Sequence, residues 1–300
     1  MLVLLGAVGP WSRAEFALIG GITIALLGLS VWPKESKFAS KWLIQACVVL
    51  LGFRLDLAKL AESAQDGFFL AVGTIVGAIL IGLLLGKLLR TSREVSVLVT
   101  AGTAICGGSA IVAIGTALGA TTSNMAVATG AIFLLNAIGL WTLPAIGHSL
   151  GLSEIEFGQW AGIALHDIAS VGGASKEYGS VAFETATIVK LTRVIWITPL
   201  AILAGRYGAS RASSGKSAPF PWFILGFLAA SCVRSLFPEI ASLDEAFTQT
   251  AGVGFRAALF LIGSGLTFAA LREVGFRAIA QAAILWILVA SGSLVVIKML

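Results

Sequence analysis

Long uncharged runs set the strongest limit on how this chain can fold. Residues 67–86 and 278–297 each contain 20 residues without a single Asp, Glu, Lys or Arg. About 20 residues of α-helix are needed to cross the roughly 30 Å hydrocarbon core of a bilayer. The whole chain is 58% hydrophobic and 12% charged, whereas soluble domains average about 25% charged residues. The sequence therefore predicts an all-α polytopic membrane protein, with the lipid bilayer as its solvent.

The hydropathy pattern predicts about ten transmembrane helices in one transmembrane domain that occupies residues 1–300. No soluble domain is expected, because the longest hydrophilic stretch, residues 206–219, is a short Ser/Gly-rich linker. The apolar residues 1–9 lack the basic residues of a signal peptide. The predicted spans are 16–32, 38–56, 66–89, 95–119, 124–147, 156–174, 179–205, 219–237, 246–270 and 276–298.

The basic residues indicate the orientation. Counted over alternate loops, one side receives 11 Lys and Arg residues and the other receives 6. Because positive charge is retained on the cytoplasmic side, the sequence predicts a multi-pass protein of the bacterial inner membrane with both termini outside. A role in binding nucleic acid is not expected, since these charges lie at helix ends. The richer side has Lys34, Lys37, Lys41, Lys87, Arg90, Arg93, Arg206, Arg211, Lys216, Arg272 and Arg277; the other has Arg13, Arg54, Lys59, Lys176, Arg234 and Lys298.

Two short segments resemble each other and predict an internal repeat. Residues 51–62 (LGFRLDLAKLAE) and 262–273 (IGSGLTFAALRE) align without gaps, with Gly52 matching Gly263. Seven predicted spans separate the copies, so they would cross the membrane in opposite directions. This is the pattern of an inverted repeat, typical of secondary transporters. The repeat-related stretches are about 16–89 and 219–300, and the core motif segments lie at about 95–205.

A W-x-x-P pattern conflicts with that repeat. It occurs at Trp141–Pro144 and at Trp196–Pro199, in predicted spans that are two apart and therefore run in the same direction. The conflict disappears if one span is re-entrant, and the sequence leaves this open.

The first segment with chemical character is AGTAICGGSAIVAIG, residues 101–115. A glycine pair weakens a helix, and here it is flanked by Thr103, Cys106 and Ser109. We expect a broken helix near mid-membrane. The half-helix that begins after Gly107 and Gly108 would offer backbone N–H groups and a positive dipole end to an anion. The alternative is that these small residues only allow close helix packing.

The second segment is ALHDIASVGGASKEYG, residues 164–179. Its glycine pair, Gly172 and Gly173, predicts another broken helix and further substrate contacts. His166 and Asp167 are ionisable groups within an apolar span, where charges are costly and usually functional. Because His titrates near neutral pH, we expect this pair to couple transport to an ion. Hydration near the interface is the structural alternative.

Two cations lie in the span that follows. Lys190 and Arg193 are three residues apart, so they share a helix face. They are expected to bind an anion, supplied by the substrate or by Asp167. Arg256 has a carboxylate such as Glu184 as a candidate partner. For the amide Asn136, ordinary hydrogen bonding between helices is expected.

The motifs that are absent from the sequence narrow the possible functions but leave several open. No P-loop and no hydrolase or metalloprotease motif is present, so we expect neither an enzyme nor a cofactor or metal site. A secondary active transporter of a small anion, coupled to protons or sodium, fits the residues best, and a homodimer is left open. The alternatives are a cation/proton antiporter with Asp167 as the cation ligand, an intramembrane enzyme using Cys106 or Ser109 with His166, and a membrane scaffold.

With these residues in hand, the chain resembles the YeiH-like sulfate-exporter family of bacterial inner-membrane proteins. The resemblance rests on LLGFRLDLAKL (50–60), GTAICGGSAI (102–111), LSEIEFGQWAG (152–162) with His166–Asp167, and KLTRV (190–194). It implies a secondary transporter with two broken helices that exports sulfate, sulfite or small sulfonates. The family pattern has His-Glu at the position where this chain has His166–Asp167, so ion or substrate preference is expected to differ.

Overall fold

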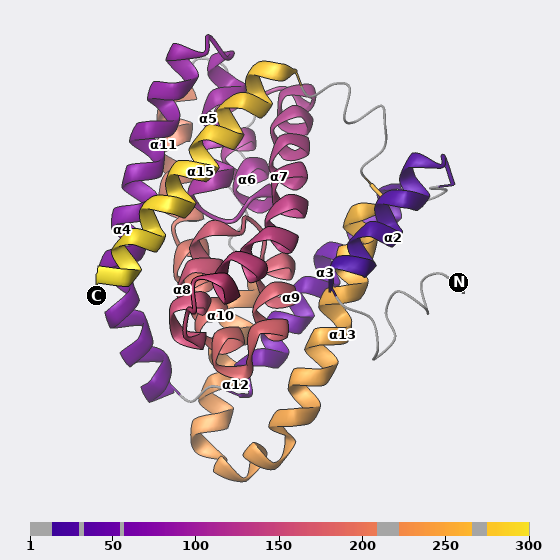
Figure 1. The fold of residues 1–300 in the computed structure, drawn as a ribbon, viewed down its shortest axis with the longest axis vertical. Helices are drawn as coiled ribbons and strands as arrows, with labels where there is room; N and C mark the ends of the chain where they lie inside the picture. The colour runs from indigo at the N-terminus through magenta and orange to yellow at the C-terminus, as the bar shows by residue number, and fades with distance from the viewer. Residues whose placement is uncertain (1–13, 30–32, 55–56, 209–221, 266–274, 300) are drawn as a thin grey trace.

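The computed structural model describes residues 14–29, 33–54, 57–208, 222–265 and 275–299, and its regular elements there are all helical. The prediction of an all-α protein is confirmed for these residues (Figure 1). The helices are α2 (Ala14–Leu26), α3 (Pro33–Gly52), α4 (Leu57–Leu88), α5 (Arg93–Ala104), α6 (Gly108–Leu118), α7 (Thr122–Ser149), α8 (Glu154–Ala164), α9 (Ile168–Tyr178), α10 (Ser180–Val194), α11 (Ile197–Gly208), α12 (Trp222–Leu236), the 3-10 helix η1 (Pro238–Leu243), α13 (Asp244–Gly263) and α15 (Phe276–Met299).

Four helical segments in the described part of the chain are long and apolar enough to cross a membrane. A fifth exists if the pair 222–236 and 238–263, which bends by 115°, counts as one span. Large apolar side chains such as Leu80, Leu84 and Ile287 are exposed along these helices, as expected where the solvent is hydrocarbon. The four segments are Leu70–Leu88, Ser123–Ser149, Ser180–Arg206 and Phe276–Met299.

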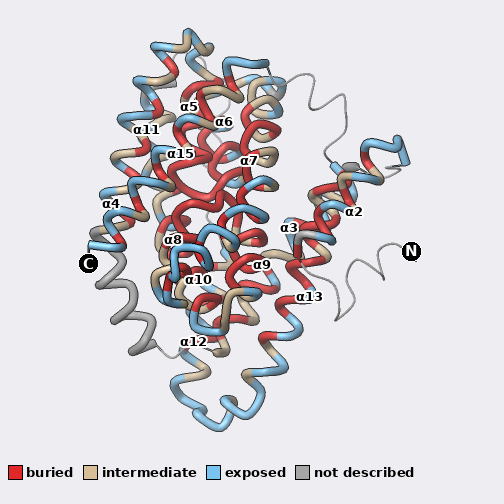
Figure 2. The backbone as a smooth tube through the Cα atoms, in the orientation of Figure 1, coloured by how far each residue is buried: buried red, intermediate tan, exposed pale blue. Residues whose placement is uncertain are grey.

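The helices form two groups. In one group, α13 packs on α2 and α3, and α12 packs on α3. This group lies at the lower right in Figure 1, and we call it the panel. Phe53 stacks on Phe247 at 5.4 Å between ring centroids, and Cys47 lies beside Gly254, so α3 and α13 are antiparallel. The second group, which we call the core, contains α4–α11 and α15 and holds most of the buried residues (Figure 2).

Within the core, α5 and α6 form a hairpin. Gly102 of α5 faces Ile111 of α6, and Leu98 faces Gly115, so the two helices are antiparallel. At the open end, Glu94 of α5 accepts a hydrogen bond from Asn124 Nδ2, next to the end of α6, at 2.7 Å. The segment 95–119 therefore enters and leaves the core at the same end, and the prediction that it is a single span is corrected.

The segment α8–α9 forms a second hairpin, from the opposite end of the core. Tyr178 Oη at the end of α9 donates to the carbonyl oxygen of Leu152, just before α8, at 2.8 Å. The rings of Phe157 and Tyr178 stack at 3.8 Å. Glu154 at the start of α8 accepts from the backbone N–H of Val181 at the start of α10. The prediction of a single span at 156–174 is corrected in the same way.

The two hairpins change the direction of the helices between them. Helix α7 starts beside Glu94 and ends near Tyr178, whereas α10 starts beside Glu154 and α11 ends near Ala117 of α6. Helix α7 is therefore antiparallel to α10–α11. The W-x-x-P conflict disappears, because the segment between these helices turns back.

Candidate functional site

The tips of the two hairpins meet inside the core. The first tip contains Gly107, which precedes α6 with φ +66° and ψ −126°. The second contains His166, between α8 and α9. A Cβ built on Gly107 would lie 3.4 Å from both the Cβ and the carbonyl oxygen of His166. The backbones of the tips therefore touch where residue 107 has no side chain.

Lys190 of α10 binds both tips through the backbone. It is fully buried, and its Nζ donates to the carbonyl oxygens of Leu165 at 2.6 Å and Ile105 at 3.4 Å. These carbonyls lie at the C-terminal ends of α8 and α5, where a helix carries partial negative charge. Lys190 therefore neutralises two helix ends at once.

Arg193, one turn further along α10, acts in the same way. It is fully buried, and its guanidinium donates to the Ala104 carbonyl oxygen at 2.5 Å and to Thr74 Oγ1 at 2.6 Å. The sequence predicted that Lys190 and Arg193 would pair with a substrate or with Asp167. In the described part of the structure, Lys190 and Arg193 donate to backbone carbonyls and to the hydroxyl of Thr74. The sequence analysis did not identify Thr74.

Asp167 caps the second hairpin. Its carboxylate accepts from the N–H and the hydroxyl of Ser170, both at 2.9 Å, and caps α9 as expected for Asp at this position. Asn136 of α7 donates to the same carboxylate and to Ser170 Oγ, while its Oδ1 accepts from the His166 N–H at 2.8 Å. Asn136 thus holds the tip in place. An isolated amide in an apolar span was the only signal for it in the sequence.

The His166 imidazole stands out from this network. The residue is 2% exposed, and among the described residues neither Nδ1 nor Nε2 has a hydrogen-bond partner. The Trp286 ring lies 6.4 Å away between centroids. Buried polar atoms in proteins are nearly always paired. An unpaired imidazole at the hairpin contact is therefore a candidate ligand-binding group.

The first tip offers a second binding group. Helix α6 starts at Gly108 with no side-chain cap, so N–H groups of its first turn have no carbonyl partner within the helix. Gly108 is half-buried and Ser109 is exposed, while Thr103 and Cys106 are buried. The hydroxyl of Thr103 has no partner among the described residues. The predicted residues 103 and 106–109 therefore gather at this tip, beside His166.

Gly172 and Gly173 lie elsewhere. They are inside α9, against Phe255 and Leu259 of α13. The second break is at Leu165–Asp167, so the prediction of a break at the glycine pair is corrected. These glycines allow close packing of core and panel.

The charges at the hairpin contact favour an anion. Lys190 and Arg193 are two cations, and Asp167 is the one carboxylate in this described network. Two helix N-termini and two C-termini also meet here, and their partial charges of opposite sign offset each other. Across the described residues, no group of three or more His, Cys, Asp or Glu gathers that could hold a metal ion.

Comparison with known proteins identifies the family. The family described as Conserved hypothetical protein 698 matches residues 12–282. A UPF0324 membrane protein of Geobacter sulfurreducens is 40% identical over 293 residues, covering 97% of this chain and 92% of the relative. Similar proteins of Porphyromonas gingivalis (40% over 296 residues; 97% and 88%) and Vibrio vulnificus (34% over 296 residues; 98% and 95%) carry the same description. These names give no substrate, and no solved structure matches the chain. The chain belongs to this UPF0324 family and is a multi-pass bacterial membrane protein.

Proposed function

We propose that this protein is a secondary transporter that carries a small anion, of the sulfate, sulfite or sulfonate type, through the contact between its two hairpins. One observation supports this most directly. The uncapped first turn of α6 lies beside His166, a buried imidazole whose ring nitrogens have no described partner. Helix N-termini bind anions through backbone N–H groups, and a protonated imidazole would add two donors.

The role of Asp167 distinguishes this proposal from cation/proton antiport. A cation ligand needs carboxylate oxygens that are free to coordinate. Both oxygens of Asp167 already accept hydrogen bonds from Ser170 and Asn136. Asp167 therefore fits a capping role better than that of a cation ligand, and His166 is the group proposed to exchange a proton.

An inverted repeat supports transport. Gly52 of α3 approaches the backbone of Phe227 in α12, and its aligned partner Gly263 of α13 approaches the backbone of Leu18 in α2. The matched glycines thus serve equivalent contacts on antiparallel helices. The hairpins α5–α6 and α8–α9 are the corresponding pair in the core. The other matched positions of the repeat, 55–62 and 266–273, lie outside the side chains that the structure describes.

The proposed topology has eight crossings and two re-entrant hairpins. The crossings are α2, α3, α4, α7, α10–α11, α12, α13 and α15. Removing two of ten spans leaves both termini on one side and leaves the 11-to-6 distribution of Lys and Arg unchanged. The end of the core where α5–α6 enters is then cytoplasmic, and the membrane is the bacterial inner membrane.

The two hairpins differ in their packing, which supports alternating access. Gly172, Gly173 and Lys176 of α9 face the panel, where Gly172 meets Phe255, Gly173 meets Leu259 and Lys176 donates to the Thr248 carbonyl oxygen at 3.0 Å. Counted from the tips, the equivalent positions of α6 are Val112, Ala113 and Thr116. Val112 and Thr116 are exposed, as is Ser109 near the tip, whereas Ala113 is buried. We infer that the hairpin contact is closed toward the outside and open toward the cytoplasm.

This inference predicts one-sided access to Ser109. In a Cys232→Ser background, which removes the exposed cysteine, Ser109→Cys should react with a membrane-impermeant thiol reagent in inside-out vesicles and resist it in right-side-out vesicles. The matched control is Ala169→Cys, at the equivalent buried position of α9, which should react from neither side. Equal labelling of Ser109→Cys from both sides would contradict the assignment.

The transport proposal predicts a specific loss in His166→Ala. Purified protein in liposomes should take up radiolabelled sulfite or sulfate when a pH gradient is imposed, and His166→Ala should lower the rate at least about 100-fold, the lower range of the effect of an acid–base group. His148→Ala is the control, since His148 is the other histidine and is exposed. Wild-type protein without flux of either anion would remove the sulfate-type substrate class, and equal flux in His166→Ala would remove the role of His166.

A further inference from the structure

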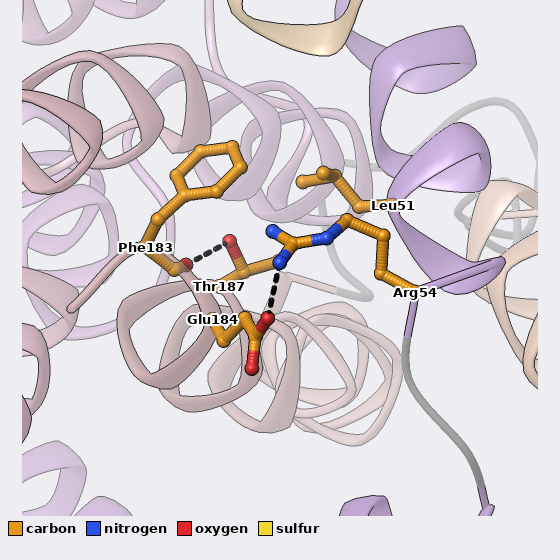
Figure 3. A pocket seen from close by; sticks show the side chains of 5 residues that line it. All are labelled: Leu51, Arg54, Phe183, Glu184 and Thr187. Carbon is orange, nitrogen blue, oxygen red and sulfur yellow. Dashed lines mark hydrogen bonds and ion pairs between the residues drawn. The ribbon is translucent and has the colours of Figure 1, made fainter. Parts of the chain in front are cut away.

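A small cavity lies between the panel and the core at the end where α8–α9 enters. It is partly open, its interior volume is about 10 Å³, and it is lined by Leu51 and Arg54 from the end of α3 and by Phe183, Glu184 and Thr187 from α10. Figure 3 shows the Arg54 guanidinium extending from the panel toward Glu184 and Thr187. Of the two ionic side chains, Glu184 is the more exposed, at 35% against 11% for Arg54. The cavity therefore opens at Glu184.

Arg54 is only partly satisfied. Its NH2 donates to Glu184 Oε1 at 2.5 Å, so Glu184 pairs with Arg54, whereas the sequence had suggested Arg256 as a candidate partner. The Nε and NH1 atoms of Arg54 are buried and have no partner among the described residues. A guanidinium binds a carboxylate best through two parallel hydrogen bonds. The single bond to Glu184 leaves donors available to another acceptor in the cavity.

The cavity lies close to the hairpin contact. Thr187 precedes Lys190 by three residues on α10, which is one helical turn, and Arg193 follows after another turn. Thr187 and Phe183 are buried, so the inner end of the cavity points along α10 toward the two buried cations. Thr187, which lines the cavity, is thus one turn of helix from the cation that holds both tips.

Only one half of the repeat carries this arginine. In the alignment of 51–62 with 262–273, the position of Arg54 is occupied by Gly265. The cytoplasmic side, where the face of α6 is exposed, has no arginine at the matching place. The Arg54–Glu184 pair therefore joins panel and core on the side that is closed.

We propose that this cavity is a second anion subsite, on the outer side, where a small oxyanion binds Arg54 in place of Glu184 and so loosens the contact between panel and core. The role of this subsite in transport rests on the proposed function, in which the anion travels to the hairpin contact. The planar guanidinium favours a sulfate-type oxyanion, which accepts two parallel hydrogen bonds. Glu184 competes for the same donors and keeps the subsite closed without the anion.

The test measures anion binding to purified full-length protein, so it does not depend on transport. Sulfate and sulfite are titrated while thermal unfolding is followed. Glu184→Gln removes the competing charge and should lower the apparent Kd about tenfold, whereas Arg54→Gln should raise it about tenfold, since charge-assisted hydrogen bonds commonly contribute this much. Arg54→Lys keeps the charge without the fork and should lie between wild type and Arg54→Gln. Arg234→Gln is the control, because Arg234 forms a comparable ion pair with Asp244 outside the cavity.

The directions in which Glu184→Gln and Arg54→Gln change the apparent Kd decide whether the cavity is an anion subsite. A purely structural ion pair would make Glu184→Gln and Arg54→Gln change binding in the same direction or leave it unchanged, and either result overturns the subsite. Repeating the titration in a His166→Ala background separates the cavity from the hairpin contact, where the opposite shifts should persist. Opposite shifts in a protein that transports neither anion would retain the subsite and remove the proposed function. Transport by a protein whose anion binding is unchanged in both variants would retain the proposed function and remove the subsite.

Discussion

Replacing Lys190 with methionine should destabilise the protein more than any other single change at the hairpin contact. The ammonium group is fully buried and joins the Ile105 and Leu165 carbonyls at the ends of α5 and α8. Without it, both carbonyls are left unpaired and two partial negative charges face each other. At about 1–3 kcal/mol for each of the two unsatisfied carbonyls, we expect a loss of about 2–6 kcal/mol. The unfolding temperature in detergent should fall by roughly 5–15 °C.

Lys176→Met provides a matched control for this effect. Lys176 is half-buried and donates one hydrogen bond, to the Thr248 carbonyl oxygen. Its replacement should cost less than half as much, because one partly hydrated contact is lost. A Lys190→Met variant that unfolds within about 2 °C of wild type, roughly the effect of 1 kcal/mol or less, would show that Lys190 does not hold the tips together.

Replacing Gly107 with alanine should lower transport at least tenfold while leaving a folded protein. Its φ of +66° with ψ of −126° is the conformation of the first central residue in a type II′ turn, which glycine dominates. A Cβ there would also come into close contact with the His166 carbonyl oxygen, at 3.4 Å. We expect about 1–3 kcal/mol of backbone strain. Because the strain falls on the contact between the tips, relaxation would move α6 away from His166, and anion flux in liposomes should drop at least tenfold.

Gly119→Asn is the control for backbone strain alone. Gly119 also has a positive φ, +68°, but its ψ of 29° is left-handed helical, a conformation that Asn adopts readily. It ends α6 at the open end of the hairpin, far from the tip. Flux in Gly119→Asn should therefore stay within about twofold of wild type, a change of less than 1 kcal/mol. Equal loss of flux in both variants would show that transport responds to general destabilisation of α6.

The sequence predicted the first break correctly but misplaced the second. A glycine pair marks the first, since Gly107 adopts a conformation that side chains disfavour. The similar pair Gly172–Gly173 was read in the same way, yet these residues serve close packing on α13. At the second break, Asp167 occupies the position of Gly107 and caps α9 by its side chain. A glycine precedes α6 and a capping carboxylate precedes α9, so the two breaks do not share a sequence pattern.

The re-entrant hairpins were also beyond the reach of charge counting. Residues 120–123 and 148–155 connect the hairpins to α7, and neither stretch contains Lys or Arg. Moving these two connections to the other side changes no count, so ten spans and eight spans fit the positive residues equally well. The W-x-x-P pattern at Trp141 and Trp196 was the only sign in the sequence that a span turns back.

The sequence by itself determined the all-helical membrane class, because lipid is the solvent that suits such long uncharged runs. It also determined the residue types of the site, because ionisable groups within apolar spans are rare. Tertiary structure alone decided their partners. Lys190 and Arg193 bind backbone carbonyls at helix ends, and Arg54 binds Glu184 across 130 positions of sequence. Backbone carbonyls are the same in every residue, and distant contacts depend on how helices pack. Neither leaves a pattern in the order of amino acids.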